Sequence, residues 1–329
     1  MNQHSLPAFS PDALAIDADA EVERIVAALR AQLRGTLRKR GLVLGLSGGI
    51  DSSVCAGLAA RAVGPDRVHC LLMPEDDSDP ESLRLGRLVA DRFALSAEVE
   101  NIGPALAAMG CYDRRDGFIR QVVPAYGPGW SSKIVFANAL TTAGYNMSSL
   151  VVSDPDGRVE KHRLPAEAYL GIVAATNMKQ RTRKQFEYYH ADRLNYAVIG
   201  TPNRLEYDQG FFVKNGDGAA DVKPIAHLYK TQVYRLAEHL GVPPEVCCRP
   251  PTTDTYSMAQ TQEEFYFALP YDKMDLCLYA LDNNVPAAAV AGAVALSEDE
   301  VAMVWKDIAA KRKVARYLHL GPQLAAPLA

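Results

Sequence analysis

The sequence lacks paired cysteines. Six cysteines are scattered over 329 residues, and no two of them stand in a C-x-x-C spacing. The scattered cysteines argue against a zinc site and against a small disulfide scaffold, and they are typical of a protein from a reducing compartment. Histidines are also few. His190, His227 and His239 stand singly, without an H-E-x-x-H pattern, and we assign none of them to catalysis.

Long apolar runs and an excess of basic residues are missing too. The acidic segment 1–23 has no apolar stretch of membrane-spanning length, so we expect neither a signal peptide nor a membrane span. The formal net charge is −4, from 35 basic and 39 acidic residues, which argues against a nucleic-acid partner. Charged residues at 22% and hydrophobic residues at 48% are ordinary globular values. The sequence therefore predicts a soluble, cytoplasmic globular protein.

Residues 42–54, LVLGLSGGIDSSV, have the outline of a phosphate-binding loop but lack the lysine of G-x-x-x-x-G-K-[ST]. Gly48 and Gly49 follow an apolar strand and allow close backbone approach, and the next helix presents its N-terminal amides to an anion. Hydroxyl donors are added by Ser47, Ser52 and Ser53. Asp51 would repel a phosphate unless Mg²⁺ lay between them. The alternative is that Asp51 or Ser52 only caps the helix.

Alternating strands and helices predict the fold class. Strands are expected at 42–46, 67–74, 97–102 and 195–201, and helices at 17–40, 51–63, 78–93 and 177–194. This order is typical of an α/β protein with a doubly wound parallel sheet flanked by helices. Between about 104 and 176 the regularity lapses, and Asp156-Gly157 predicts a β-hairpin within an inserted, irregular segment. We expect one domain over 1–329, with C-terminal helices at about 255–320.

A family resemblance explains the missing lysine. SGGIDS at 47–52 resembles the pyrophosphate-loop signature of the ATP pyrophosphatases, which cleave ATP between the α- and β-phosphates. Further motifs follow in order: NMKQRTR (177–183), GTPNRLE (200–206), GFFVKNGDGAAD (210–221), PI-x-x-LYKTQV (224–233) and PPTTD (250–254). Together they resemble the ammonia-dependent NAD synthetase family.

The resemblance implies a fold and a reaction. The fold would be that of the adenine nucleotide alpha hydrolases. The enzyme would be a ligase that uses ATP, Mg²⁺ and ammonia to convert deamido-NAD to NAD. An acyl-adenylate would be the intermediate, and AMP and pyrophosphate would be released. By the same resemblance we expect a homodimer.

Site residues are implied as well. The expected ATP contacts are Gly45, Leu46, Ser47, Gly48, Gly49, Ile50, Asp51, Ser52, Thr201, Lys230 and Thr252. The expected metal ligands are Asp51 and Glu206, the latter in a loop. The expected deamido-NAD contacts are Arg181, Lys214, Asp221 and Lys311. Asp51, Lys214 and Lys230 are expected to be catalytic.

Two departures from the family pattern leave alternatives open. Ala310 stands where the family has a histidine beside Lys311, and the segment at about 104–176 is longer than the family needs. The alternatives are a related ligase that amidates a different carboxylic acid, and a catalytically silent nucleotide-binding protein. Because the loop follows directly after the first helix, we expect no glutamine-hydrolysing domain. Free ammonia, or ammonia from a separate partner, would then be the nitrogen donor.

Overall fold

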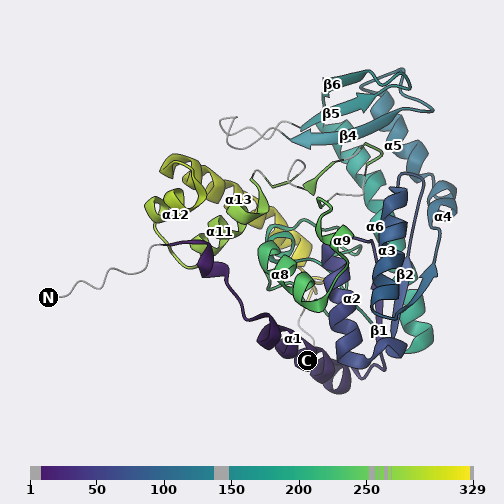
Figure 1. Ribbon diagram of the computed structural model, residues 1–329. Coiled ribbons are helices and arrows are strands. Elements are labelled where there is room, and N and C mark those ends of the chain that lie inside the picture. Colours follow the sequence, from purple (N-terminus) through teal and green to yellow (C-terminus); the bar gives the residue numbers. More distant parts are fainter. Residues whose placement is uncertain are drawn as a thin grey trace.

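The centre of the molecule is a four-stranded parallel sheet (Figure 1). The computed structural model describes residues 9–136, 148–251, 256–258, 260–262, 266–267 and 269–326. Its sheet consists of β1 (Leu42–Gly45), β2 (Val68–Leu72), β3 (Ser96–Val99) and β7 (Ala197–Val198) in the order β3-β2-β1-β7. All three strand pairs are parallel. This arrangement confirms the predicted fold class.

Successive residues of the central strands pack against helices on opposite faces of the sheet. Leu42 and Leu44 of β1 belong to the cluster formed with α1 (Ala18–Gln32), α2 (Ile50–Val63), α3 (Pro80–Arg92) and α8 (Lys230–Leu240). Val43 faces the other way, where it packs with Ala191 of α6 (Ala166–Leu194). The sheet is therefore covered on both sides, as its continuous apolar strands require.

The segment predicted to be irregular has more regular structure than its sequence indicates. It contains α4 (Gly103–Ala108), α5 (Cys111–Arg120) and a separate antiparallel sheet of β4 (Ser131–Phe136), β5 (Ser148–Ser153) and β6 (Val159–Arg163). The predicted turn at Gly157 does join β5 to β6, with a φ of 81°. The prediction that the next helix begins at Asn177 was wrong, because α6 begins at Ala166. Gly171, a residue that disfavours helix, lies in its interior because the ring of Phe118 from α5 occupies the space of a Cβ there.

A second group of helices follows the sheet and forms its own apolar cluster. These helices are α7 (Arg204–Gln209), α11 (Tyr271–Asp282), α12 (Ala287–Val294) and α13 (Glu298–His319). The short helix α9 (Pro244–Cys247) packs instead in the cluster of the main sheet, through Val246. Asp282 of α11 joins α7 to α13, because its carboxylate accepts from Arg204 and Arg312 at 2.6 Å each. In Figure 1 this group and the small antiparallel sheet lie at different ends of the molecule. No helix of the described ranges is long and apolar enough to cross a membrane.

The loop between β1 and α2 is held in place by close packing against α3. Gly48 has a φ of 75°, and a Cβ on it would lie 2.5 Å from the backbone oxygen of Ser82 and 2.9 Å from the Cβ of Leu85. The left-handed conformation alone favours glycine. Together with the nearby backbone of α3, it leaves no room for a side chain at this position.

Replacing Gly48 should therefore destabilise the protein. We expect Gly48→Ala to lower the free energy of unfolding by about 2–5 kcal/mol, the sum of left-handed strain and overpacking. Gly157→Ala is the matched control, since its φ is 81° but nothing lies within 4 Å of its Cβ position. It should cost roughly 1–2 kcal/mol. Equal losses in urea unfolding would contradict the packing argument.

We propose that the described parts form a single domain, because α6 passes through two of the apolar clusters. Its Ala168 and Ile172 pack in the cluster of the small sheet, and its Ala191 packs against the main sheet. The two tryptophans report on separate ends: Trp130 belongs to the small-sheet cluster, and Trp305 of α13 donates to the backbone oxygen of Cys277 at 2.9 Å.

Unfolding of the single-tryptophan variants Trp130→Phe and Trp305→Phe tests this proposal. Within each variant, tryptophan fluorescence and far-UV circular dichroism should give the same urea midpoint, as expected for one cooperative unit. Fluorescence and dichroism midpoints that differ within a variant would mean that one end unfolds separately.

Candidate functional site

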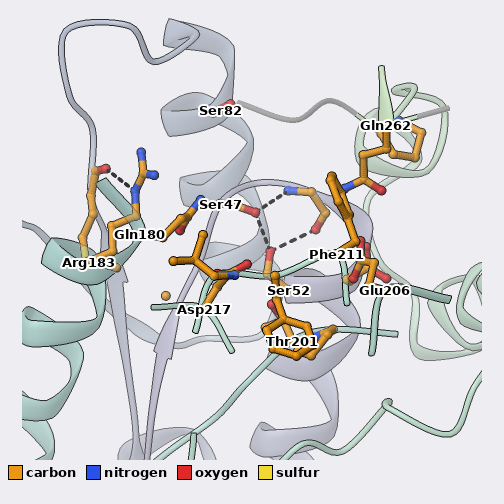
Figure 2. A pocket seen from close by; sticks show the side chains of 18 of the residues that line it. Ser47, Ser52, Ser82, Gln180, Arg183, Thr201, Glu206, Phe211, Asp217 and Gln262 are labelled. Atoms are coloured by element: carbon orange, nitrogen blue, oxygen red, sulfur yellow. Dashed lines mark hydrogen bonds between the residues drawn. The ribbon is translucent and has the colours of Figure 1, made fainter. Parts of the chain in front are cut away.

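A cavity of about 1000 Å³ lies at the carboxyl ends of β1 and β2. Its wall is formed by the loops after these strands, by one face of α6, by the segment 210–217 and by the last turns of α13. This is the edge at which open α/β sheets bind ligands. Its size lies at the upper end of the range for small-molecule sites. Figure 2 shows Ser47 and Ser52 on one side of it, with Thr201 and Glu206 close by.

The loop after β1 places backbone amides and hydroxyls at one end of the cavity. Ser47 Oγ lies 3.1 Å from Ser52 Oγ, and the hydroxyl of Ser52 donates to the backbone oxygen of Gly49 at 3.0 Å (Figure 2). Of the predicted ATP contacts, these residues line the cavity: Gly45, Leu46, Ser47, Gly49, Ile50, Asp51, Ser52 and Thr201. Gly48 packs behind the loop, and Thr252 lies outside the described residues. An anion bound here would meet the N-terminus of α2.

Four polar side chains from three helices meet beside this loop. Lys230, at the start of α8, is completely buried and forms an ion pair with Asp51 of α2. Asn203 donates from its side-chain amide to Asp51 Oδ1 at 3.1 Å. The same residue caps α7, because its Oδ1 accepts from the backbone amide of Glu206 at 3.2 Å. Glu206 therefore lies on a short helix and is buried, rather than in an exposed loop as the sequence predicts.

Electrostatics in this cluster favour a further positive charge. Burial and the nearby carboxylate of Asp51 raise the pKa of Glu206 well above its usual value. Burial lowers the pKa of Lys230, but the carboxylates of Asp51 and Glu206 more than reverse this effect, so that the ammonium form persists. The single positive charge of Lys230 cannot balance the negative charges of two carboxylates, those of Asp51 and Glu206. The two acids supply the oxygen donors that Mg²⁺ prefers, so the residues present fit that ion.

Asp275 of α11 explains how a lysine is tolerated at the N-terminus of a helix. Its carboxylate accepts from the backbone amide of Thr231 at 2.7 Å, from the Thr231 hydroxyl at 2.8 Å and from the backbone amide of Lys230 at 3.3 Å. Burial raises the pKa of Asp275 to about 6. Because this carboxylate satisfies the first turn of α8, the Lys230 side chain is free to point at Asp51. Lys230 is not among the residues that line the cavity.

Of the residues predicted to contact deamido-NAD, two line the cavity and two lie outside it. Arg181 and Lys214 line the wall, and Arg181 Nε donates to the backbone oxygen of Lys214 at 3.3 Å. Lys214 Nζ donates to the backbone oxygens of Tyr317 and Leu320 at 2.9 and 2.7 Å, so it caps the end of α13.

Asp221 and Lys311 are engaged with the protein instead. Asp221 Oδ2 accepts from the backbone amide of Val198 at 2.7 Å. Lys311 Nζ donates to the backbone oxygen of Tyr266 at 2.6 Å and pairs with Asp307 at 2.7 Å. Neither Asp221 nor Lys311 is among the cavity-lining residues. Their predicted roles stay predictions.

Sequence reasoning missed several acids that line the cavity. Glu75, Glu187 and Asp217 are such residues. Burial raises the pKa of both Glu187 and Asp217, and Lys184 lies 2.5 Å from Glu187. No spacing in the sequence marks Glu75 or Glu187, whereas Asp217 lies within the motif at 210–221 but was not assigned a role. Asn203 could have been found, since Asn203-Arg204-Leu205-Glu206 has the spacing of a capping box.

Comparisons with known proteins identify the family of this chain. The family model described as NAD synthase matches residues 21–120 and 137–315, and the unmatched stretch lies within the predicted insertion. The chain is 72% identical to the NH3-dependent NAD(+) synthetase of Rhizobium meliloti (strain 1021), over 97% of this chain and 96% of that protein. It is 61% identical to the protein of the same name from Mesorhizobium japonicum, over 95% of this chain and 98% of that one.

Solved structures share the fold. The NMN synthetase of Francisella tularensis has a TM-score of 0.66 at 21% identity, covering 95% of this chain and 100% of that chain. From the family model and these sequence relatives we conclude that the chain belongs to the NAD synthase family.

Proposed function

We propose that this protein is an NH3-dependent NAD⁺ synthetase, a ligase that converts deamido-NAD to NAD. The observation that carries the proposal is the buried cluster of Asp51, Glu206 and Lys230 beside a lysine-free phosphate loop. Support comes from the family membership and from the printed name of relatives that are 61–72% identical. The buried Glu206 and the partly buried Asp51 beside a phosphate-binding loop would serve no purpose in a purely structural turn.

ATP would lie with its β- and γ-phosphates against the loop after β1. Backbone amides at the start of α2 and the hydroxyls of Ser47 and Ser52 would hold the departing pyrophosphate. Asp51 and Glu206 would hold Mg²⁺, which would neutralise charge on the phosphates. Thr201, which follows β7 and lines the cavity, would contact the nucleoside. The missing Walker lysine is consistent with this chemistry, because no γ-phosphoryl group is transferred.

The reaction would proceed in two displacements. A carboxylate oxygen of deamido-NAD attacks the α-phosphorus, the bond to the β-phosphate breaks, and pyrophosphate leaves. Ammonia then attacks the acyl carbon of the adenylate, AMP leaves, and the nitrogen releases one proton to solvent or to a nearby carboxylate. Lys230 holds Asp51 in position and adds positive charge at the phosphates, so this chain contributes mainly placement and charge stabilisation. We also propose that Arg181 and Lys214 contact the dinucleotide from the cavity wall, and that Asp221 and Lys311 contribute to its binding.

Three further expectations are proposals. The homodimer rests on the family resemblance, the cytoplasmic location on the scattered cysteines and the composition, and a separate ammonia-supplying partner on the position of the phosphate loop directly after the first helix. All three stay predictions.

A product assay tests the proposed reaction. Protein incubated with ATP, Mg²⁺ and ammonium should form AMP and NAD in equal amounts when deamido-NAD is added, and neither product without it. AMP formed only with a different carboxylic acid would contradict the proposed substrate and establish a related ligase. The absence of AMP with any acid would indicate a silent nucleotide-binding protein.

A further inference from the structure

Two histidines and a glutamate converge on the α6 side of the sheet, away from the cavity. His69 lies on β2, Glu98 on the edge strand β3 and His190 on α6. One ligand atom from each of them lies within 4.8 Å of the others. None of the three lines the cavity described above. The pairing of β2 with β3 places His69 and Glu98 on the same face, since Leu71 pairs with Glu98 and residues two apart share a face.

The spacing of these atoms matches one face of a zinc tetrahedron. His69 Nε2 lies 3.1 Å from His190 Nδ1 and 3.2 Å from Glu98 Oε2, and His190 Nδ1 lies 3.8 Å from Glu98 Oε2. Ligands about 2.0–2.1 Å from a tetrahedral Zn²⁺ stand roughly 3.3 Å from one another. The side chain of Glu98 is 46% exposed, so solvent reaches the site and water can take the fourth position.

The hydrogen-bond partners of His190 select the imidazole tautomer that can bind a metal through Nδ1. Glu100 Oε1 lies 3.1 Å from His190 Nε2, and a carboxylate only accepts, so Nε2 carries the proton. The guanidinium of Arg193 only donates, and it lies 2.8 Å from Nδ1, so Nδ1 presents its lone pair. A ligating imidazole oriented by an outer carboxylate is the usual arrangement in protein zinc sites. His69 would bind through Nε2 after its proton moves to Nδ1, with no net change in protons.

Arg193 competes for the same position. Its guanidinium contacts His190 Nδ1 and lies 3.4 Å from Glu98 Oε2, so its positive charge occupies the position that the metal cation would take. The Arg193 side chain is 41% exposed and projects from the last turn of α6, so it can turn into solvent. Metal and guanidinium therefore exclude each other.

We propose that His69, Glu98 and His190 form a binding site for a zinc-type divalent cation that fastens α6 to the edge of the sheet. Imidazole nitrogens with one carboxylate suit Zn²⁺ and Co²⁺, whereas Mg²⁺ prefers oxygen ligands alone. The site does not rest on the proposed function, because it lies apart from the cavity. Its bound metal would stabilise α6, the helix that also carries Arg181 and Glu187 into the active site.

Metal titration of the whole, chelator-treated protein tests the proposal. Excess Mg²⁺ is kept present to occupy oxygen-only sites, Co²⁺ is added, and Zn²⁺ is then used to displace it. We expect one Co²⁺ per chain with the visible absorption of tetrahedral coordination, and a rise in melting temperature with Zn²⁺ as binding to the native state requires. Glu100→Gln should weaken binding by about 10–100-fold, as outer carboxylates do, and His69→Gln and Glu98→Gln by at least as much.

Two further variants make the test specific. Arg193→Ala should tighten binding, because it removes the competing cation. His227→Gln is the matched control: His227 lies 2.6 Å from Glu21 and from Arg24, a histidine–glutamate–arginine cluster without a second histidine. Absence of Co²⁺ binding in excess Mg²⁺, or binding that survives both His69→Gln and Glu98→Gln, would overturn the proposal. If His69→Gln fails to fold, Glu98→Gln still tests the proposal, because the Glu98 side chain is exposed.

Discussion

The ion pair between the buried Lys230 and the partly buried Asp51 is the interaction on which the rest of the site depends. It brings the first residues of α2 and α8 together at the carboxyl edge of the sheet, and Glu206 of α7 lies beside it. Removing one member of a buried ion pair typically costs about 3–5 kcal/mol, because the other charge is left uncompensated. Here the surplus of negative charge is also the feature that suits a divalent cation. The same arrangement therefore constrains both the fold and the chemistry.

Side chains that cap helices hold the cluster of Asp51, Glu206 and Lys230 in place. Asn203 satisfies the first turn of α7 and at the same time donates to Asp51, while Asp275 satisfies the first turn of α8. The side chains that carry function are thus oriented by residues that first serve helix ends. The C-terminal helices contribute through α11, which supplies Asp275, and through α13, whose end is capped by Lys214 on the cavity wall. The small antiparallel sheet adds Phe136 of β4 to the wall of the same cavity, where its ring lies against Tyr169 of α6.

Local patterns predicted most of the fold, and the failures have physical reasons. The parallel sheet followed from the alternation of predicted strands and helices. The helix predicted at 78–93 is α3, which begins at Pro80 because Asp79 caps it by accepting from the backbone amide of Glu81. The start of α6 was missed because residues 166–176 were assigned to the irregular segment; Gly171 lies inside this helix, where the ring of Phe118 occupies the space of a Cβ. The chemistry of the phosphate loop could be predicted because the residues that form it are consecutive in the sequence.

Contacts between distant residues could not be read from the sequence. Asp275 lies 45 residues after Lys230, and His190 lies 121 residues after His69. No spacing rule links such pairs; only the folded sheet and its helices bring them together. Glu206 was assigned to the metal by resemblance, while its burial and its helix came from the structure.

Exchange of labelled pyrophosphate into ATP tests the central claim most directly, because it reports the first displacement alone. Without ammonia, the wild-type protein should catalyse this exchange only when deamido-NAD and Mg²⁺ are present. Asp51→Asn should abolish the exchange while the protein keeps its folded circular dichroism spectrum. Exchange at the wild-type rate in Asp51→Asn would contradict the assignment of the Asp51, Glu206 and Lys230 cluster as the place where ATP is cleaved.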